Sequence, residues 1–69
     1  MSKFRIQIAD ESNREYVFAE IWYEDQLIAE IIQETGQAEI VLYTEVSTIF
    51  NYHDFVRAVE SAKKHLFCE

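Results

Sequence analysis

The spacing of the hydrophobic residues changes along this chain, from every second residue near its start to every third or fourth residue near its end. Residues 3–9 alternate between polar and apolar side chains, the pattern of a strand with one buried face. After Asn51 the apolar residues recur at helical spacing, as Phe55, Val59, Ala62 and Leu66. Asn51 is a favourable N-cap residue, and Asp54 places a carboxylate in the first turn. The pattern predicts a strand near the start and one helix over about 52–67.

Three more strands are predicted between these two segments. Residues 15–24 and 38–44 are rich in aromatic and β-branched residues, which favour strands. Residues 27–34 also contain helix-forming residues, but the flanking turns and the neighbouring strands favour a strand. Thr35-Gly36 suits a two-residue hairpin turn because glycine adopts a positive φ. We therefore predict one α+β domain over residues 1–69. It is a four-stranded antiparallel β-meander, with strands over about 3–9, 15–24, 27–34 and 38–44 and one C-terminal α-helix packed on one face.

The lengths of the three connections set the pairing of the predicted strands. We assign four residues to the first loop (11–14), three to the second (24–26) and two to the third (35–36). The resulting cross-strand pairs include Ile6 with Ala19, Tyr23 with Leu27, and Ile31 with Ile40. This choice collects apolar side chains on one face, which the helix is expected to cover: Phe4, Ile6, Ile8, Val17, Ala19, Ile21, Tyr23, Leu27, Ala29, Ile31, Ile40 and Leu42.

The other face of the predicted sheet combines aromatic, aliphatic and charged side chains. Arg5, Glu20 and Glu30 fall in one cross-strand row, with the arginine beside the first acid. No further segment remains to cover this face, and a large exposed apolar patch usually marks an interface. The residues predicted to bind another protein are Phe18, Glu20, Trp22, Ile28, Glu30, Ile32, Glu39, Val41 and Tyr43. We expect its three aromatic residues to be apolar anchors and its three glutamates to supply charge complementarity.

Composition restricts the class of partner. The chain has 69 residues, 49% of them hydrophobic, and a net charge of −7, with the excess acid in residues 1–50. Such a charge repels nucleic acid and anionic membranes and attracts basic proteins. The alternative is that it serves solubility alone, because net charges of this size are ordinary for small soluble domains. Cys68 is the only cysteine, so no internal disulfide can form, and no apolar stretch approaches the about 20 residues of a membrane helix. These features predict a cytoplasmic protein that binds another protein, with neither nucleic acid nor membrane as partner.

The sequence offers little that predicts catalysis. Glu20 and Glu30 are a candidate carboxylate pair for hydrolysis or ligand binding. His53 and His65 lie more than three helical turns apart, too far to share a metal ion. Cys68 and the serines lack the neighbours that activate a nucleophile. We therefore expect no enzyme activity, no catalytic residues, no metal and no cofactor.

Four segments together resemble a pattern found in small acidic bacterial immunity-type proteins, which neutralise a toxin domain. These segments are Ala19–Tyr23, Leu27–Ile31, Ala38–Tyr43 and Phe55–Val59. The resemblance implies an inhibitory role in which carboxylates meet a basic toxin surface, and it assigns no binding residue.

Three functional hypotheses follow. The leading one is a non-enzymatic protein-binding module, acting as an immunity-like inhibitor through the open sheet face. The second is a self-associating structural or regulatory homodimer with no foreign partner. The third is a small ligand-binding or hydrolytic protein that uses Glu20 and Glu30.

Overall fold

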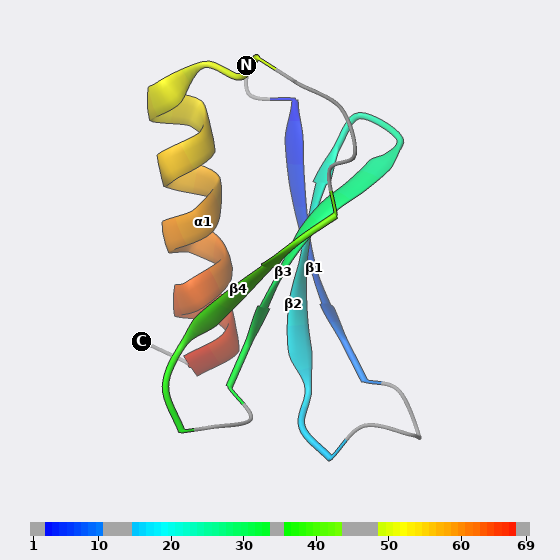
Figure 1. Cartoon of the computed structure of the whole chain (residues 1–69), viewed down its shortest axis with the longest axis vertical. Helices are drawn as coiled ribbons and strands as arrows, with labels where there is room; N and C mark the ends of the chain where they lie inside the picture. Colours follow the sequence, from blue (N-terminus) through cyan, green and yellow to red (C-terminus); the bar gives the residue numbers. More distant parts are fainter. Residues whose placement is uncertain (1–2, 11–14, 34–35, 44–48, 68–69) are drawn as a thin grey trace.

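The chain forms one four-stranded antiparallel sheet with a single helix against one face (Figure 1). The elements of this computed structural model are β1 (Phe4–Ala9), β2 (Phe18–Tyr23), β3 (Gln26–Ile32), β4 (Glu39–Leu42) and α1 (Tyr52–Phe67). The structure describes residues 3–10, 15–33, 36–43 and 49–67. The strands lie in the order β1-β2-β3-β4, so the predicted meander and C-terminal helix are confirmed. The predicted loop 11–14, the ends of two predicted strands at Glu34 and Thr44, Thr35 and Cys68 lie outside the described residues.

The strand pairing agrees with the prediction at one hairpin and departs from it at another. Between β3 and β4, Ile31 lies opposite Ile40, as predicted. Between β1 and β2, Ile6 lies opposite Ile21 instead of Ala19. The reason is that residues 15–17 belong to the connection and β2 begins only at Phe18. A shift of two residues leaves every side chain on its predicted face, because the side-chain period of a strand is two.

A β-bulge changes the pairing of β2 with β3. Ile21 lies opposite Ala29, as predicted, but the register then shifts by one residue and Trp22 lies opposite Leu27. Directly opposed residues share a face, so Leu27 lies on the face of Trp22 and not, as predicted, in the core. Ile28 is the extra residue, and it belongs to the buried hydrophobic cluster. The predicted face of Leu27 is therefore wrong, and Ile28 is buried although it was predicted to contact a partner.

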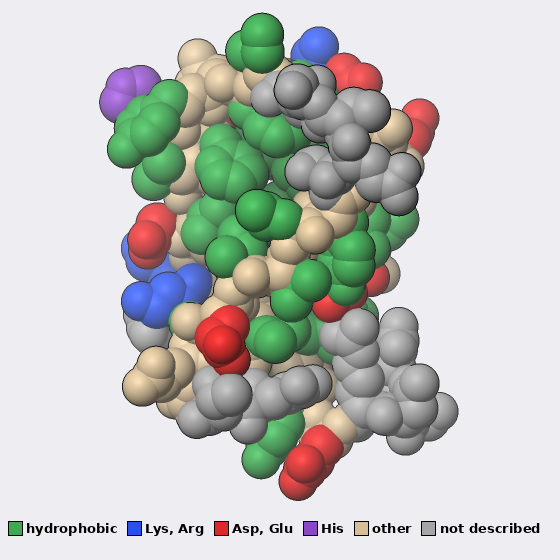
Figure 2. Space-filling view, in the orientation of Figure 1, with side chains coloured by type: hydrophobic (Ala, Val, Ile, Leu, Met, Phe, Trp, Pro, Cys, Tyr) green, Lys and Arg blue, Asp and Glu red, His purple; other side chains and the backbone are tan. Residues whose placement is uncertain are grey.

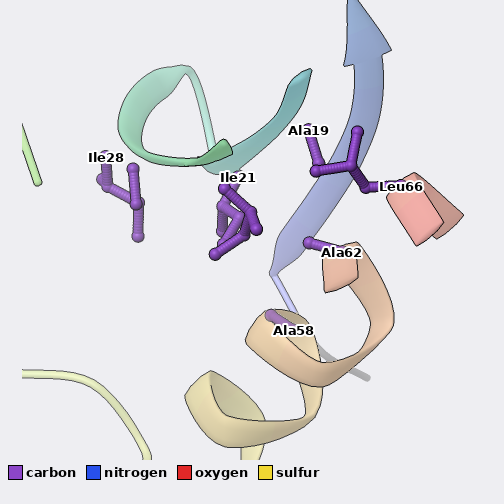
Figure 3. Close-up of a cluster of buried hydrophobic side chains, with 8 residues drawn as sticks. Ala19, Ile21, Ile28, Ala58, Ala62 and Leu66 are labelled. Atoms are coloured by element: carbon purple, nitrogen blue, oxygen red, sulfur yellow. The ribbon is translucent and has the colours of Figure 1, made fainter. Parts of the chain in front are cut away.

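The core lies between α1 and the sheet (Figure 3). The helix contributes two alanines and a leucine, and the strands contribute alanines and isoleucines. The buried residues are Ala19, Ile21, Ile28, Ala29, Ile31, Ala58, Ala62 and Leu66. The alanines let the helix backbone approach the strands closely, while Ile21 is fully buried and supplies volume between them.

Four aromatic rings connect the start of α1 to the ends of β1 and β2. Phe4 lies 4.9 Å from Tyr23, 5.3 Å from Phe50 and 5.9 Å from Phe55, measured between ring centroids. Phe50 and Phe55 stack with an interplanar angle of 3°. Such pairs stabilise by about 0.5–1.5 kcal/mol beyond their buried area. The sequence analysis gave no role to Phe50, which precedes the predicted helix.

Local hydrogen bonds define the ends of α1. The Asn51 side-chain oxygen accepts from the backbone N–H of Asp54 at 3.0 Å, which confirms the predicted N-cap. In the last turn, Nδ1 of His65 lies 2.7 Å from the carbonyl oxygen of Ser61, which can accept only if this nitrogen carries the proton. Within the described ranges, no helix is both long and apolar enough to cross a membrane.

The turn between β2 and β3 is tied to the residue that precedes β1. Glu24 lies in the left-handed region, with φ 54°, and its backbone N–H donates to the Lys3 carbonyl at 3.1 Å. The two side chains form an exposed ion pair at 3.2 Å. The hydrogen bond to Glu24, together with its negative charge, raises the pKa of the Lys3 ammonium group above 10.5.

The helix covers only part of the sheet. It packs against β1, β2 and β3 but not against β4. A helix is about 10–12 Å wide and strands are spaced about 4.8 Å apart, so one helix covers two to three strands. Ile40 and Leu42 therefore stay 44% and 60% exposed, although the sequence analysis placed both beneath the helix.

Candidate functional site

The predicted binding residues lie at different depths in the structure. We call the sheet face opposite α1 the outer face (Figure 1). Phe18 and Glu30 are buried, at 1% and 4% exposed, and Ile28 belongs to the core. Four predicted residues are half-buried and two are exposed: Glu20, Trp22, Ile32 and Val41, then Glu39 and Tyr43. A partner can therefore contact only the last six of the nine.

Phe18 and Glu30 are shielded because both lie on the central strands. Glu30 has Glu20 opposite it on β2 and Val41 opposite it on β4. Phe18 lies opposite Ala9 at the start of β2. A strand in the middle of a sheet has neighbours on both sides, so side chains from both neighbouring strands flank its own. The expectation that the outer face is uncovered is wrong for these two side chains.

Three side chains form a connected group on the exposed part of the outer face. The Arg5 guanidinium carbon lies 5.0 Å from the centroid of the Trp22 ring, a cation–π contact. Nε1 of Trp22 donates to a carboxylate oxygen of Glu20 at 3.3 Å. Arg5 also donates to the side-chain oxygen of Gln7 at 2.9 Å. These contacts hold the indole ring at both its face and its N–H, so the ring loses little further freedom on binding.

The predicted row of Arg5, Glu20 and Glu30 is not formed. Because β1 is shifted by two residues, Arg5 lies opposite Trp22, and Gln7 lies opposite Glu20. The arginine therefore reaches the acid through the indole ring instead of facing it directly. The sequence analysis placed Arg5 on this face but did not include it among the binding residues.

Glu20 and Glu30 lie opposite each other, as predicted. Glu30 is buried, however, so only Glu20 reaches the surface. Glu20 in turn accepts the hydrogen bond from Trp22. In the described ranges, no three His, Cys, Asp or Glu side chains are grouped so that they could hold a metal ion.

A second exposed apolar surface lies on the helix side of the molecule. Figure 2 shows hydrophobic side chains on the surface between α1 and β4. The exposed large apolar residues of β4, α1 and the segment before α1 include Ile40, Leu42, Ile49, Tyr52 and Val56. The sequence analysis missed this surface because it assumed that one helix covers all four strands.

The segments that resemble immunity-type proteins lie on β2, β3, β4 and α1. The first three pair side by side in the sheet, and α1 packs against that sheet. The resemblance remains a prediction from the sequence, since comparison of the chain with protein-family models, with curated proteins and with solved structures finds no match.

Proposed function

We propose that this protein is a non-enzymatic protein-binding module that uses its outer face, and that it acts as an immunity-like inhibitor of a basic partner. The observation that carries the proposal is the set of residue types on this face. Arg5, Trp22 and Tyr43 lie there at least partly accessible, and Tyr43 is 45% exposed. Arginine, tryptophan and tyrosine are the residues enriched at the energetic centres of protein interfaces.

The geometry around Trp22 favours binding by a preorganised surface. The ring is held by Arg5 and by Glu20 before any partner arrives. Fixing a side chain in advance removes an entropy cost of about 0.5–1.5 kcal/mol that an interface otherwise bears. Of the three predicted aromatic anchors, Trp22 and Tyr43 therefore remain accessible, and Trp22 is the central anchor of the proposed site.

The charge of the chain supports a basic partner. The net charge is −7, and exposed acids lie at the edges of the described sheet and in its turns: Asp10, Glu15, Glu24, Asp25 and Glu39. Negative charge around an apolar centre speeds the encounter with a positively charged surface and makes it sensitive to salt. Association with the partner should therefore slow as ionic strength rises.

Replacement of Trp22 by alanine tests the proposal. The tagged full chain is used to capture proteins from the cell that produces it, and the captured proteins are quantified by mass spectrometry. We expect at least one protein to bind the wild type and to bind Trp22→Ala about 30-fold more weakly, since an interface hot spot contributes about 2 kcal/mol or more.

Tyr52→Ala is the matched control, because Tyr52 is an exposed aromatic residue on α1, away from the outer face. It should leave capture unchanged. Circular dichroism establishes that both variants are folded. Equal capture by a folded Trp22→Ala protein and the wild type would contradict the proposal.

A further inference from the structure

We infer that a second copy of this chain pairs with the free edge of β4, so that two sheets join into one of eight strands. The inference concerns the edge and helix side of β4. It shares Glu39, Val41 and Tyr43 with the outer-face site, but it does not involve Trp22. It is argued from the direction of the backbone groups, the two-fold pairing of the side chains and the placement of charge.

Alternate residues of β4 direct their backbone N–H and C=O groups away from β3. Tyr43 donates its N–H to the Ile28 carbonyl of β3 at 2.9 Å. In an antiparallel pair every second residue exchanges such bonds, so Val41 is also directed toward β3. The N–H and C=O groups of Ile40 and Leu42 therefore point away from β3. Among the described strands β4 pairs with β3 alone, so these groups form the sheet edge.

Most of the β4 edge lacks the side chains that prevent pairing. Edge strands are commonly protected by short length, charged side chains, proline, a bulge or a covering element. β4 is short and begins with the charged Glu39, but Ile40–Leu42 contain neither a charge nor proline, and α1 does not pack on β4. The opposite edge strand, β1, carries Arg5 at its second residue and packs against α1. The structure thus leaves β4 as the edge that can accept another strand.

A second copy fits this edge in one antiparallel register. The two-fold axis passes beside Val41, so that Val41 lies opposite Val41 of the other copy. Ile40 then lies opposite Leu42, and both contribute the backbone groups that point outward. If the second strand slipped by one residue, backbone groups that point toward β3 would lie opposite groups that point outward. The side chains of the second copy would also turn to the opposite face of the sheet. Slipping by two in the direction of Gly36 would place Leu42 opposite Ala38 and remove apolar contact.

The charges agree with this register. Glu39 lies opposite Tyr43 of the second copy instead of opposite another glutamate, so like charges do not meet directly. On the helix side, the exposed side chains of Ile40 and Leu42 meet their counterparts. Because α1 leaves β4 uncovered, the second copy approaches without meeting the helix. An acidic chain can thus associate through a contact whose centre is uncharged, with Glu39 at its two ends.

Cysteine cross-linking tests the register in the full chain. Cys68, the only native cysteine, is replaced by serine, and Val41→Cys is introduced. Opposed residues that exchange no hydrogen bonds have Cα atoms about 4.5 Å apart, within the range that a disulfide spans. We expect Val41→Cys to form a disulfide-linked dimer as the main product of mild oxidation, as seen on a non-reducing gel.

Glu39→Cys in the same background is the matched control. In the inferred register two residues 39 lie roughly 14 Å apart along the strands, so this variant should form no disulfide and should run as a single chain on the gel. A folded Val41→Cys protein that cross-links no faster than Glu39→Cys would overturn the inference. Adding Trp22→Ala to Val41→Cys should leave the cross-linking unchanged. A failure of cross-linking can therefore be told apart from a loss of partner binding caused by Trp22→Ala, because Trp22 does not belong to the paired edge.

Discussion

The alternation of side chains along β2 predicts that Phe18 lies on the outer face, but its side chain is as buried as that of a core residue. Its side chain is 1% exposed and is one of the two largest that are fully buried. Truncating a buried phenylalanine to alanine costs about 3–5 kcal/mol, because transfer energy and packing are both lost. We therefore expect Phe18→Ala to lower the free energy of unfolding by that amount, measured by urea denaturation.

Two further substitutions separate this stability effect from binding. Phe18→Leu keeps most of the volume and should cost less than about 1.5 kcal/mol, which retains a folded protein for binding measurements. Tyr43→Ala, on the exposed part of the outer face, should change stability by no more than about 0.5 kcal/mol. A Phe18→Ala protein as stable as Tyr43→Ala would contradict the burial of Phe18.

The faces of single residues could be predicted only where the strands pair regularly. Alternation correctly placed Ile21 and Ala29 in the core. It failed at Leu27 and Ile28 because the bulge inserts one residue there, so Leu27 lies opposite Trp22 and Ile28 is buried in the cluster. The sequence gives no warning there, since both residues are apolar and neither is glycine. Packing in the folded protein determines which of two similar apolar side chains is buried, and the local sequence pattern does not contain that information.

At the scale of the element, the start of α1 depends on one side chain. Asn51 accepts the hydrogen bond from the Asp54 N–H, and Phe55 in the next position contacts Phe4 and Phe50. Loss of an N-cap costs about 0.5–2 kcal/mol. We expect Asn51→Ala to lower the free energy of unfolding by about 1 kcal/mol in chemical denaturation. Asn51→Asp retains an acceptor and should be nearly neutral; a similar loss in both variants would contradict the capping role.

The helix was easier to predict than the strand pairing. Its bounds follow from the N-cap and from an apolar period that runs without interruption, and the structure places it at Tyr52–Phe67 as predicted. The pairing of β1 with β2 depends instead on how many residues the connection takes, and residues 15–17 have strand-like composition although they lie outside β2. Composition alone cannot decide whether such residues continue a strand or a loop.

At the scale of the whole molecule, the candidate site was predicted in part. The outer face and the accessibility of Trp22, Val41 and Tyr43 follow from the alternation. The burial of Glu30 and the exposure of Leu42 do not, because they depend on the strands that flank β3 and on the width of one helix relative to four strands. Both are properties of the assembled layers, so no segment of the sequence carries them by itself.

Pairing through β4 has a consequence for the stability of the whole molecule. If the folded state is a dimer, raising the protein concentration favours it by mass action. For a domain of this size each tenfold increase should raise the melting temperature by about 3–6 °C, measured by calorimetry. Leu42→Lys places a charge at the paired edge and should abolish this dependence, whereas Ile8→Lys, with a similarly exposed apolar residue on β1, should retain it. A wild-type melting temperature that is independent of concentration would show that the folded unit is the single chain.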